Sequence, residues 1–222
     1  MNANAAAQGR TKVTISPERW DRLFAPSSCL AMITTVDREG NVNAASFGTC
    51  VRVCHDPVFL AFTVGAGKDT YANVLAWPEF TVNLPPFERE LLEKSVVLGV
   101  AFPVHVNELD KAGLTPIPAL EVAPPRIAEC NRHFECRVTW TREWLDRLMV
   151  VGEVVAVSAD PDCVDDAGYL VWEQARPVHY CGWAYGHVFV AAYERIEVVN
   201  PYQGEEVGWG ERPRRWRRER GT

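Results

Sequence analysis

The sequence predicts a mainly β protein that folds as one small antiparallel barrel with a few short helices. Two observations predict this fold. β-rich runs follow one another at close spacing with turn signals between them, and only three or four short segments have a helical pattern. The chain has 222 residues, of which 47% are hydrophobic, and this is enough to bury one sizeable core.

The first elements are a helix and three strands. The stretch SPERWDRLF (16–24) predicts a helix with Ser16 as N-cap and Pro17 at its first position. Two β-rich runs then flank DREGN (37–41), which predicts a hairpin. The Asp-Pro pair at 56–57 predicts a turn that opens a third strand, DPVFLAFTV.

The middle of the chain alternates between short helices and loops. We expect a helix over 69–77 and a fourth strand in EFTVNLP (79–85). Residues 87–112 are expected to be helical or irregular, with Gly113 ending the last helix. The proline-rich stretch 114–127 predicts an extended loop.

The second half supplies the remaining strands. Strong β patterns over 127–140 and 149–160 predict two strands, and TREWLDRL (141–148) predicts a short helix between them. We expect a surface loop over 160–168. Residues 176–199 are expected to close the sheet.

Charge is distributed unevenly along the chain. Residues 211–222 hold six arginines and two glutamates, so the other residues carry 17 basic and 27 acidic side chains, a net charge of −10. An acidic body argues against a nucleic-acid-binding domain. We predict three parts: a flexible tail (1–15), one domain (16–205) and an arginine-rich tail (206–222).

Compartment follows from cysteine usage and the lack of targeting segments. No stretch reaches the roughly 18 apolar residues needed to span a bilayer, and the N-terminus has no signal-peptide pattern. Seven cysteines in mostly apolar surroundings indicate buried thiols rather than a disulfide framework. We therefore expect a cytoplasmic protein that is not bound to a membrane.

The stretch GAGKDTYANVLAWPEF (65–80) allows two interpretations. A lysine just before a helix start, with Asp69 and Thr70 in the first turn, suggests a phosphate site, because helix N-termini expose unpaired N–H groups. The alternative is a surface helix with Asp69 as N-cap and Lys68 solvated. Neither a Walker loop nor a dinucleotide fingerprint is present, so the stretch alone favours the surface helix.

Other chemistry finds little support in the sequence. In CVRVCH, Cys50, Cys54 and His55 lack a second ligand pair for zinc, so we expect no metal site. No G-x-S-x-G or H-E-x-x-H motif occurs, and the five histidines have no telling spacing, so no catalytic residue is assigned. Cysteine redox chemistry stays open; it would require an accessible thiol with a depressed pKa.

The order of several motifs is more specific than any one of them. The segments TTVDREGNVNAASFG, DPVFLAFTV and GKDTYANVLAWPEFTVNL, followed by KAGLTP, PPRIAEC and PVHYCGWAYG, resemble the flavin reductase-like, FMN-binding split-barrel family, which includes flavoredoxin. The resemblance covers roughly residues 25–200. It implies an FMN-binding split β-barrel of Greek-key-like topology, with FMN as cofactor and a homodimeric assembly.

The resemblance also implies which residues hold FMN. One group follows the first hairpin and would line the ribityl chain and ring, and the other would cradle the phosphate; together they are Asn43, Ala45, Ser46, Phe47, Thr49, Cys50, Lys68, Asp69, Thr70 and Asn73. The small residues Ala44, Ala45 and Gly48 would leave room for an open ring face. The partner that stacks on the ring stays open between Phe47, Trp183 and Tyr185.

Three functions remain at this point. One is an NAD(P)H-dependent flavin reductase that uses NADH or NADPH, and the second is a flavoredoxin-like carrier that exchanges electrons with a redox partner protein. The insert at 87–125 is closer to flavoredoxin and would cover the cofactor. The third is a non-catalytic split-barrel binding module that does not use flavin.

Overall fold

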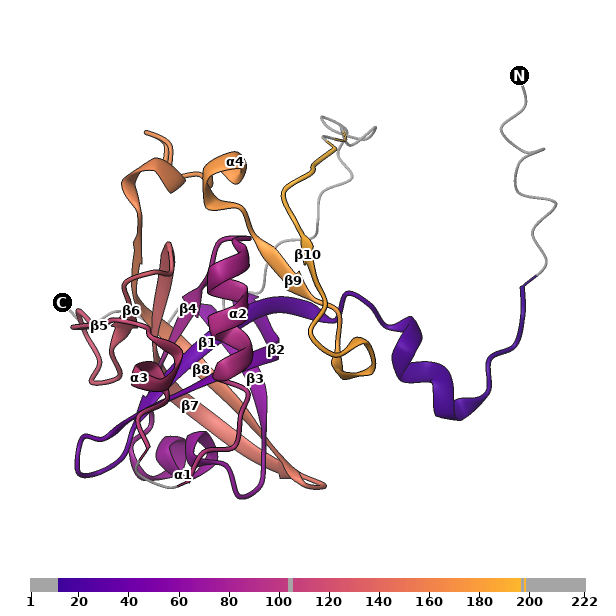
Figure 1. Ribbon diagram of the computed structural model, residues 1–222. Helices are drawn as coiled ribbons and strands as arrows, with labels where there is room; N and C mark the ends of the chain where they lie inside the picture. The colour runs from indigo at the N-terminus through magenta and orange to yellow at the C-terminus, as the bar shows by residue number, and fades with distance from the viewer. Residues whose placement is uncertain (1–11, 104–105, 197, 199–222) are drawn as a thin grey trace, which may run out of the picture.

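Six antiparallel strands form a closed barrel. The computed structural model describes residues 12–103, 106–196 and 198. The sheet order is β1-β2-β3-β8-β7-β4, and β1 also pairs with β4, which closes the ring (Figure 1). The strands are β1 (Ser28–Val36), β2 (Val42–His55), β3 (Val58–Gly65), β4 (Glu79–Leu84), β7 (Arg132–Trp144) and β8 (Arg147–Ala159). The mainly β barrel is confirmed, with β3 pairing to the distant β8 rather than to β4.

The first hairpin forms where DREGN predicted it. Asp37 Oδ1 accepts from the backbone N–H groups of Glu39 and Asn41 at 2.9 and 2.8 Å. Gly40 has φ +84°, a conformation that glycine adopts without strain. This Asp-centred turn is the local reason why the chain reverses between β1 and β2.

The second hairpin differs from the prediction. The segment 141–148 is not a helix, because β7 and β8 continue through it and are joined by Leu145 and Asp146 alone. Leu145 takes φ +53°, a conformation that leucine rarely adopts. The turn has leucine where glycine or asparagine would be expected, so the sequence carries no signal for it. The cross-strand pair of Trp144 with Arg147 supports the hairpin, and such pairing is invisible to a local pattern.

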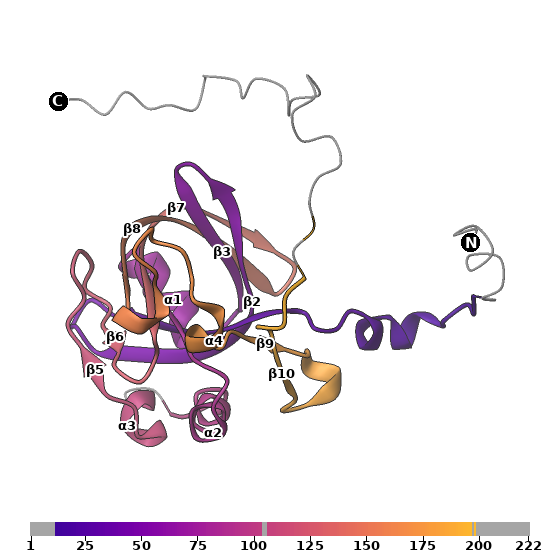
Figure 2. The same cartoon turned by 90° about the horizontal axis from the view of Figure 1, so that it is seen from above.

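The helices are short and lie outside the barrel or across one end of it. They are α1 (Asp69–Ala76), α2 (Arg89–Val97), α3 (Glu108–Ala112) and α4 (Trp172–Ala175), with 3-10 turns η1 (Pro17–Leu23), η2 (Pro161–Cys163) and η3 (Trp183–Tyr185). α1 lies at one end of the barrel, and α2 and α3 lie side by side on its outer surface (Figures 1 and 2). Gly113 ends α3 with φ +64°, as predicted.

The two terminal segments of the domain lie outside the barrel. η1 forms where a helix was predicted, but Ser16 makes no capping hydrogen bond, and the segment extends away from the barrel (Figures 1 and 2). β9 (Val178–Tyr180) pairs with β1, and β10 (Phe189–Ala191) pairs with β9. The expectation that 176–199 closes the sheet is therefore wrong, since the β1–β4 pair closes it.

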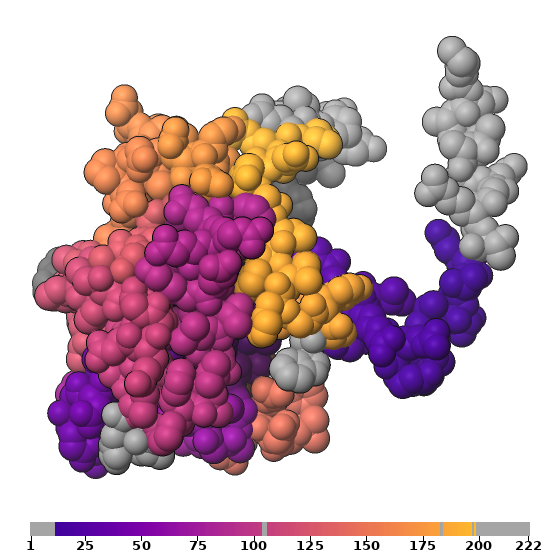
Figure 3. Space-filling model, in the orientation of Figure 1, coloured from indigo at the N-terminus to yellow at the C-terminus, as the bar shows by residue number. Residues whose placement is uncertain are grey.

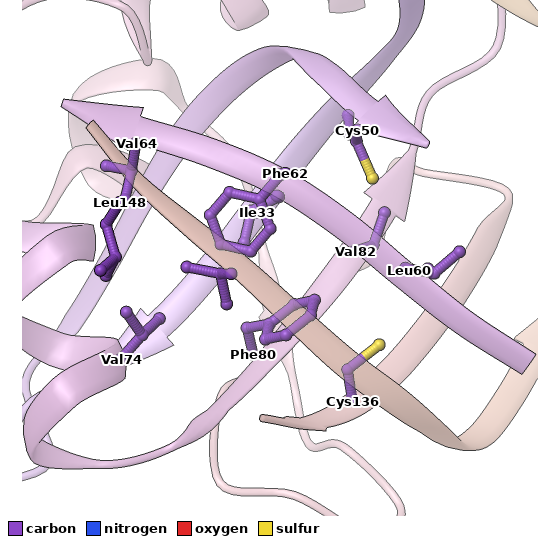
Figure 4. Packing of buried hydrophobic residues seen from close by; sticks show 12 residues of the cluster. Ile33, Cys50, Leu60, Phe62, Val64, Val74, Phe80, Val82, Cys136 and Leu148 are labelled. Atoms are coloured by element: carbon purple, nitrogen blue, oxygen red, sulfur yellow. The ribbon is translucent and has the colours of Figure 1, made fainter. Parts of the chain in front are cut away.

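The proline-rich loop and the core complete the domain. Within the loop, β5 (Pro116–Ile117) and β6 (Arg126–Ile127) form a small ladder. Phe62 and Phe80 meet edge to face at 5.1 Å inside the barrel, where the cluster in Figure 4 fills the interior. A second apolar cluster joins α2 and α3 to the outer surface of β1 and β2 through Met32 and Ala44.

Some predictions lie outside the described residues. The arginine-rich tail at 206–222 and positions 1–11 of the N-terminal tail are among them, so the domain limits stay predictions. No helix among the described residues is long and apolar enough to cross a membrane.

Candidate functional site

Two basic side chains lie beside Gly65 at the turn between β3 and α1. Arg147 pairs with Gly65 in the β3–β8 register, on the outward face of the sheet. A Cβ placed on Gly65 would lie 3.5 Å from Arg147 Nη1 and 4.0 Å from Lys68 Cγ, so both side chains flank this glycine. Lys68 is exposed, and within the described part of the chain the ion pair of Arg147 is with the exposed Asp146, with Nε 3.6 Å from Oδ1. Such an exposed pair holds the guanidinium weakly, which leaves it available to an anion.

The start of α1 adds unpaired N–H groups to these cations. The first backbone bonds into the helix run from the N–H groups of Tyr71 and Ala72 to the carbonyl of Lys68, at 2.9 and 3.2 Å. Within the described residues, the N–H groups of Lys68, Asp69 and Thr70 have no backbone acceptor. Lys68 is thus the N-cap residue, and the expectation that Asp69 is the N-cap is wrong. Unpaired N–H groups and the helix dipole favour an anion at this point.

A buried polar network holds α1 against the barrel. Asn43 Nδ2 donates to Thr70 Oγ1 at 2.8 Å and to Thr35 Oγ1 at 3.2 Å, and Asn73 Nδ2 donates to Thr35 Oγ1 at 3.1 Å. Thr70 is only 1% exposed. Three of the predicted cofactor residues therefore do come together, but their side chains contact one another. In this arrangement they fix the position of the helix start instead of presenting their polar atoms at the surface.

The other predicted residues of β2 divide between the two faces of the strand. Phe47 points into the barrel, where its ring meets Phe62 edge to face at 5.0 Å. Cys50 is buried in the same cluster, and Ala45 is half-buried. Ser46 lies on the outer face and donates to the carbonyl of Ser95 in α2 at 2.6 Å. These contacts give each residue a packing role that its sequence position did not reveal.

Thr49 is the exposed member of the predicted group on β2. Its Oγ1 accepts from the N–H of Thr63 at 3.2 Å and donates to the carbonyl of Thr63 at 3.3 Å. Thr63 and Gly65 alternate with the buried Phe62 and Val64 along β3, so they share the outward face. The outward residues Thr49, Thr63 and Gly65 therefore form a strip along β3 that ends beside Lys68 and Arg147.

Space that the sequence assigned to the flavin ring is partly filled. Ala44 is buried under α3, and its N–H donates to Glu108 Oε2 at 3.3 Å. A Cβ on Gly48 would lie 2.3 Å from Tyr180 Cδ1, so the tyrosine ring covers that glycine. Figure 3 shows α2 and the segments after it covering this side of the barrel. Tyr185 lies on η3, where its hydroxyl donates to the carbonyl of Arg22, and the side chain of Trp183 is outside the described part.

Two residues near the site were missed from the sequence. Arg147 was assigned to a predicted helix, and only the β7–β8 hairpin brings it beside Gly65. Glu108 of α3 is buried. Desolvation raises its pKa, and the nearby Asp69 carboxylate raises it further. No local pattern marks either residue, since both reach the site through pairing or packing over long sequence distances.

Cysteine and acidic groups complete the survey of possible ligands. Cys50 is enclosed in the core while His55 is exposed. Among the described residues, the one group of three possible metal ligands is Asp160, Asp162 and Cys163, and both aspartates are exposed. Exposed carboxylates of this kind are common without a metal, and nothing else in this loop points to one.

Sequence comparison decides the family. The model of the flavin reductase-like domain matches residues 26–182, which is more than half of the chain. The chain belongs to the flavin reductase-like family. A flavin cofactor and flavin-related oxidoreductase chemistry follow from this membership.

Individual relatives agree with the family. A protein of Aquifex aeolicus without an assigned role is 32% identical over 161 residues, covering 70% of this chain and 81% of the relative. Nitrilotriacetate monooxygenase component B from Bacillus cereus superposes with a TM-score of 0.74 at 22% identity, over 86% of this chain and 100% of that one. Flavoredoxin of Desulfovibrio vulgaris (Miyazaki F) gives 0.70 at 20%, over 79% and 92%. At such identities the two structures show that the flavin reductase-like barrel is shared.

Proposed function

We propose that this flavin reductase-like protein binds FMN and transfers electrons through it. The observation that carries the proposal is the turn between β3 and α1, where Lys68, Arg147 and unpaired N–H groups converge. Two cations and a helix N-terminus form a binding place for a phosphate. FMN carries one terminal phosphate, so this place suits one end of the cofactor.

The residues present fit the phosphate in a specific way. Lys68 and Arg147 supply positive charge, and the N–H groups of Lys68, Asp69 and Thr70 supply donors. The Asp69 carboxylate would repel a phosphate, so its contribution is the backbone N–H alone. The hydroxyl of Thr70 already accepts from Asn43, which keeps these donors in a fixed direction. Rigid donors lose little freedom on binding, and this favours affinity.

The strip along β3 gives the rest of the cofactor a path. Thr49, Thr63 and Gly65 line it, and Gly65 places no side chain between the stem of Lys68 and the guanidinium of Arg147. When bound, the flavin supplies the hydride and electron chemistry itself, which agrees with the lack of an acid–base pair in the sequence. The chain's own task is to bind and orient the ring along this strip.

Two electron donors fit this proposal. One is NADH or NADPH, which would make the protein a flavin reductase. The other is a redox partner protein, as for a flavoredoxin-like carrier, and the insert at 87–125 favours it. The hydrogen bond from Ser46 to the Ser95 carbonyl and the packing of Ala44 against this insert hold it over the outer face of β2. The insert therefore blocks access for a small electron donor from that side.

Anaerobic spectroscopy separates these donors. The purified protein, reconstituted with FMN, is mixed with NADH or NADPH and the flavin absorbance is followed. Rapid bleaching would identify a reductase, and a stable spectrum that dithionite nevertheless bleaches would identify a carrier. Protein that takes up no FMN would contradict the proposal and favour the non-catalytic binding module.

A further inference from the structure

Two cysteines face one another across the first strand pair of the barrel. Cys29 of β1 and Cys50 of β2 are register partners, and both thiols are free. Opposed residues of an antiparallel pair have Cα atoms about 4.5–5.5 Å apart and side chains on the same face. Disulfides span Cα distances of about 4.4–6.8 Å, so a bond between these residues requires little backbone movement.

The two cysteines are already in contact. The Cys29 thiol donates a hydrogen bond to the carbonyl oxygen of Cys50, with Sγ 3.2 Å from that oxygen. A bulge in β2 precedes this pair: two steps along β1, from Cys29 to Ala31, match three along β2, from Cys50 to Phe47. The bulge therefore sets the register that places the two cysteines opposite each other.

The environments of the two thiols differ in a way that separates their roles. Cys50 is 3% exposed and points into the barrel, as Figure 4 shows, whereas Cys29 is only half-buried. The hydrogen bond from Cys50 lowers the pKa of Cys29 to about 7, and Arg132 acts in the same direction. The same hydrogen bond and burial raise the pKa of Cys50. Of the two thiols, Cys29 is therefore the one that loses its proton more readily, and Cys50 keeps its proton.

The remaining described cysteines lack this combination. Burial raises the pKa of Cys130 and Cys136 well above the ordinary value, and Cys163 is buried with a raised pKa as well. Cys181 is also buried. Cys54 is half-buried in β2, and its Sγ lies 3.9 Å from the carbonyl of Asp56. Cys54 therefore provides a natural comparison: a reachable thiol without a neighbouring thiol that donates to it.

We propose that Cys29 and Cys50 form a redox pair that hydrogen peroxide converts to a cross-strand disulfide. The Cys29 thiolate attacks one peroxide oxygen, so an S–O bond forms, the O–O bond breaks and hydroxide leaves to take up the proton that Cys29 released. The sulfur of Cys50 then attacks the sulfenic acid, an S–S bond forms, and the departing hydroxide takes the Cys50 proton. In total two thiols lose two electrons and peroxide becomes two waters.

The inference does not depend on the proposed cofactor, and peptide mapping tests it directly. The reduced full-length protein is treated with hydrogen peroxide in native buffer, quenched in acid, alkylated and digested with trypsin. Cleavage after Arg22, Arg38 and Arg52 places the two cysteines in separate peptides, 23–38 and 39–52. We expect these two peptides to be joined, with the loss of two hydrogen atoms. The peptide 53–68, which holds Cys54, should be recovered in its alkylated form, because its thiol stays free.

Variants identify the order of the steps. Cys29→Ser should abolish the link, and Cys54→Ser should leave it unchanged. In Cys50→Ser the hydroxyl can still donate to Cys29, so the reaction should stop at a sulfenic acid that dimedone labels on peptide 23–38. A peroxide-treated wild type with no link, a link from 39–52 to the Cys136 peptide 133–137, or dimedone labelling confined to Cys54 would overturn the proposal.

Discussion

His133 shows how strongly the fold perturbs a single titratable residue. The side chain lies on β7 and is 5% exposed, with Nδ1 2.9 Å from Asn83 Oδ1. Burial lowers the pKa of His133 to about 4, and the nearby Arg126 adds to the effect. The neutral ring is therefore part of the folded structure, where it completes the polar contacts of Asn83.

The sign of the resulting pH dependence is fixed. The folded-state pKa lies below the unfolded value of about 6.5, so the unfolded state binds more protons between pH 6.5 and 4. His133 thus contributes stability that is present above pH 6.5 and is lost as the pH falls toward 4. In urea unfolding at pH 7 and pH 4.5, we expect His133→Gln to lose less stability on acidification than the wild type.

The exposed His55 supplies a control for this experiment. His55→Gln should keep the wild-type difference between the two pH values, because that ring is exposed at the end of β2. An equal loss of stability in the wild type and in His133→Gln would show that the buried ring does not produce the pH dependence.

The positions of individual residues were partly accessible from the sequence. Lys68 stands beside glycines and a helix start, and its exposed position agrees with the predicted anion site. Thr70 carries the same kind of signal, yet its hydroxyl is buried against Asn43, because the helix lies across the barrel end. A side chain's direction depends on the face that packs, and an eight-residue helix gives too short a pattern to fix it.

At the scale of elements, β4 packs closely on β8 because the Phe80 ring lies directly over Gly152. A Cβ on Gly152 of β8 would lie 2.5 and 2.7 Å from Phe80 Cε1 and Cζ, and 3.1 Å from the carbonyl oxygen of Arg137. Gly152→Ala should destabilise the protein by about 1–3 kcal/mol, the usual range for overpacking a core. The measurement is the urea midpoint of the purified variant.

A second strand glycine provides the matched control. Gly65→Ala meets its neighbours only at 3.5 and 4.0 Å, which are ordinary contacts, so its stability should change by about 0.5 kcal/mol or less. If the two variants had the same midpoint, the close approach of Phe80 to Gly152 would not be a constraint on the sheet.

Most elements could be predicted, and the exceptions share a cause. Turns with a side-chain signal, such as Asp37 with Gly40, appear where expected. The two-residue turn at Leu145 has no such signal, and its absence led to a predicted helix in place of strand ends. The β1–β4 closure joins residues about 50 positions apart, as in the Met32–Asn83 pair, and no local pattern contains that information.

At the scale of the whole molecule, η1 leaves apolar side chains without cover. Trp20, Leu23 and Phe24 are 62%, 65% and 74% exposed on a segment that extends away from the barrel (Figures 1 and 2). Soluble monomers rarely expose such clusters. The homodimer that the family resemblance implies would offer a surface for these apolar side chains, so we propose that the protein forms a dimer.

Light scattering tests the assembly. For a chain of 24.9 kDa, a dimer would have a mass of about 50 kDa, twice that value. Replacing Trp20 and Phe24 by serine should shift the mass toward that of one chain if η1 packs on a second copy. A wild type that elutes at the mass of one chain at all concentrations would contradict the dimer.

The β3–α1 turn is proposed to bind the phosphate of FMN, and a paired titration tests this binding most directly. Wild type and the double variant Lys68→Ala, Arg147→Ala are titrated with FMN and with riboflavin, which lacks the phosphate, and Lys111→Ala serves as a control. Each exposed charge contact is worth about 1 kcal/mol, roughly fivefold in Kd. We therefore expect the double variant to bind FMN about 25-fold more weakly, with riboflavin binding unchanged. Equal affinity of the wild type for FMN and riboflavin, or unchanged FMN binding in the double variant, would contradict the account.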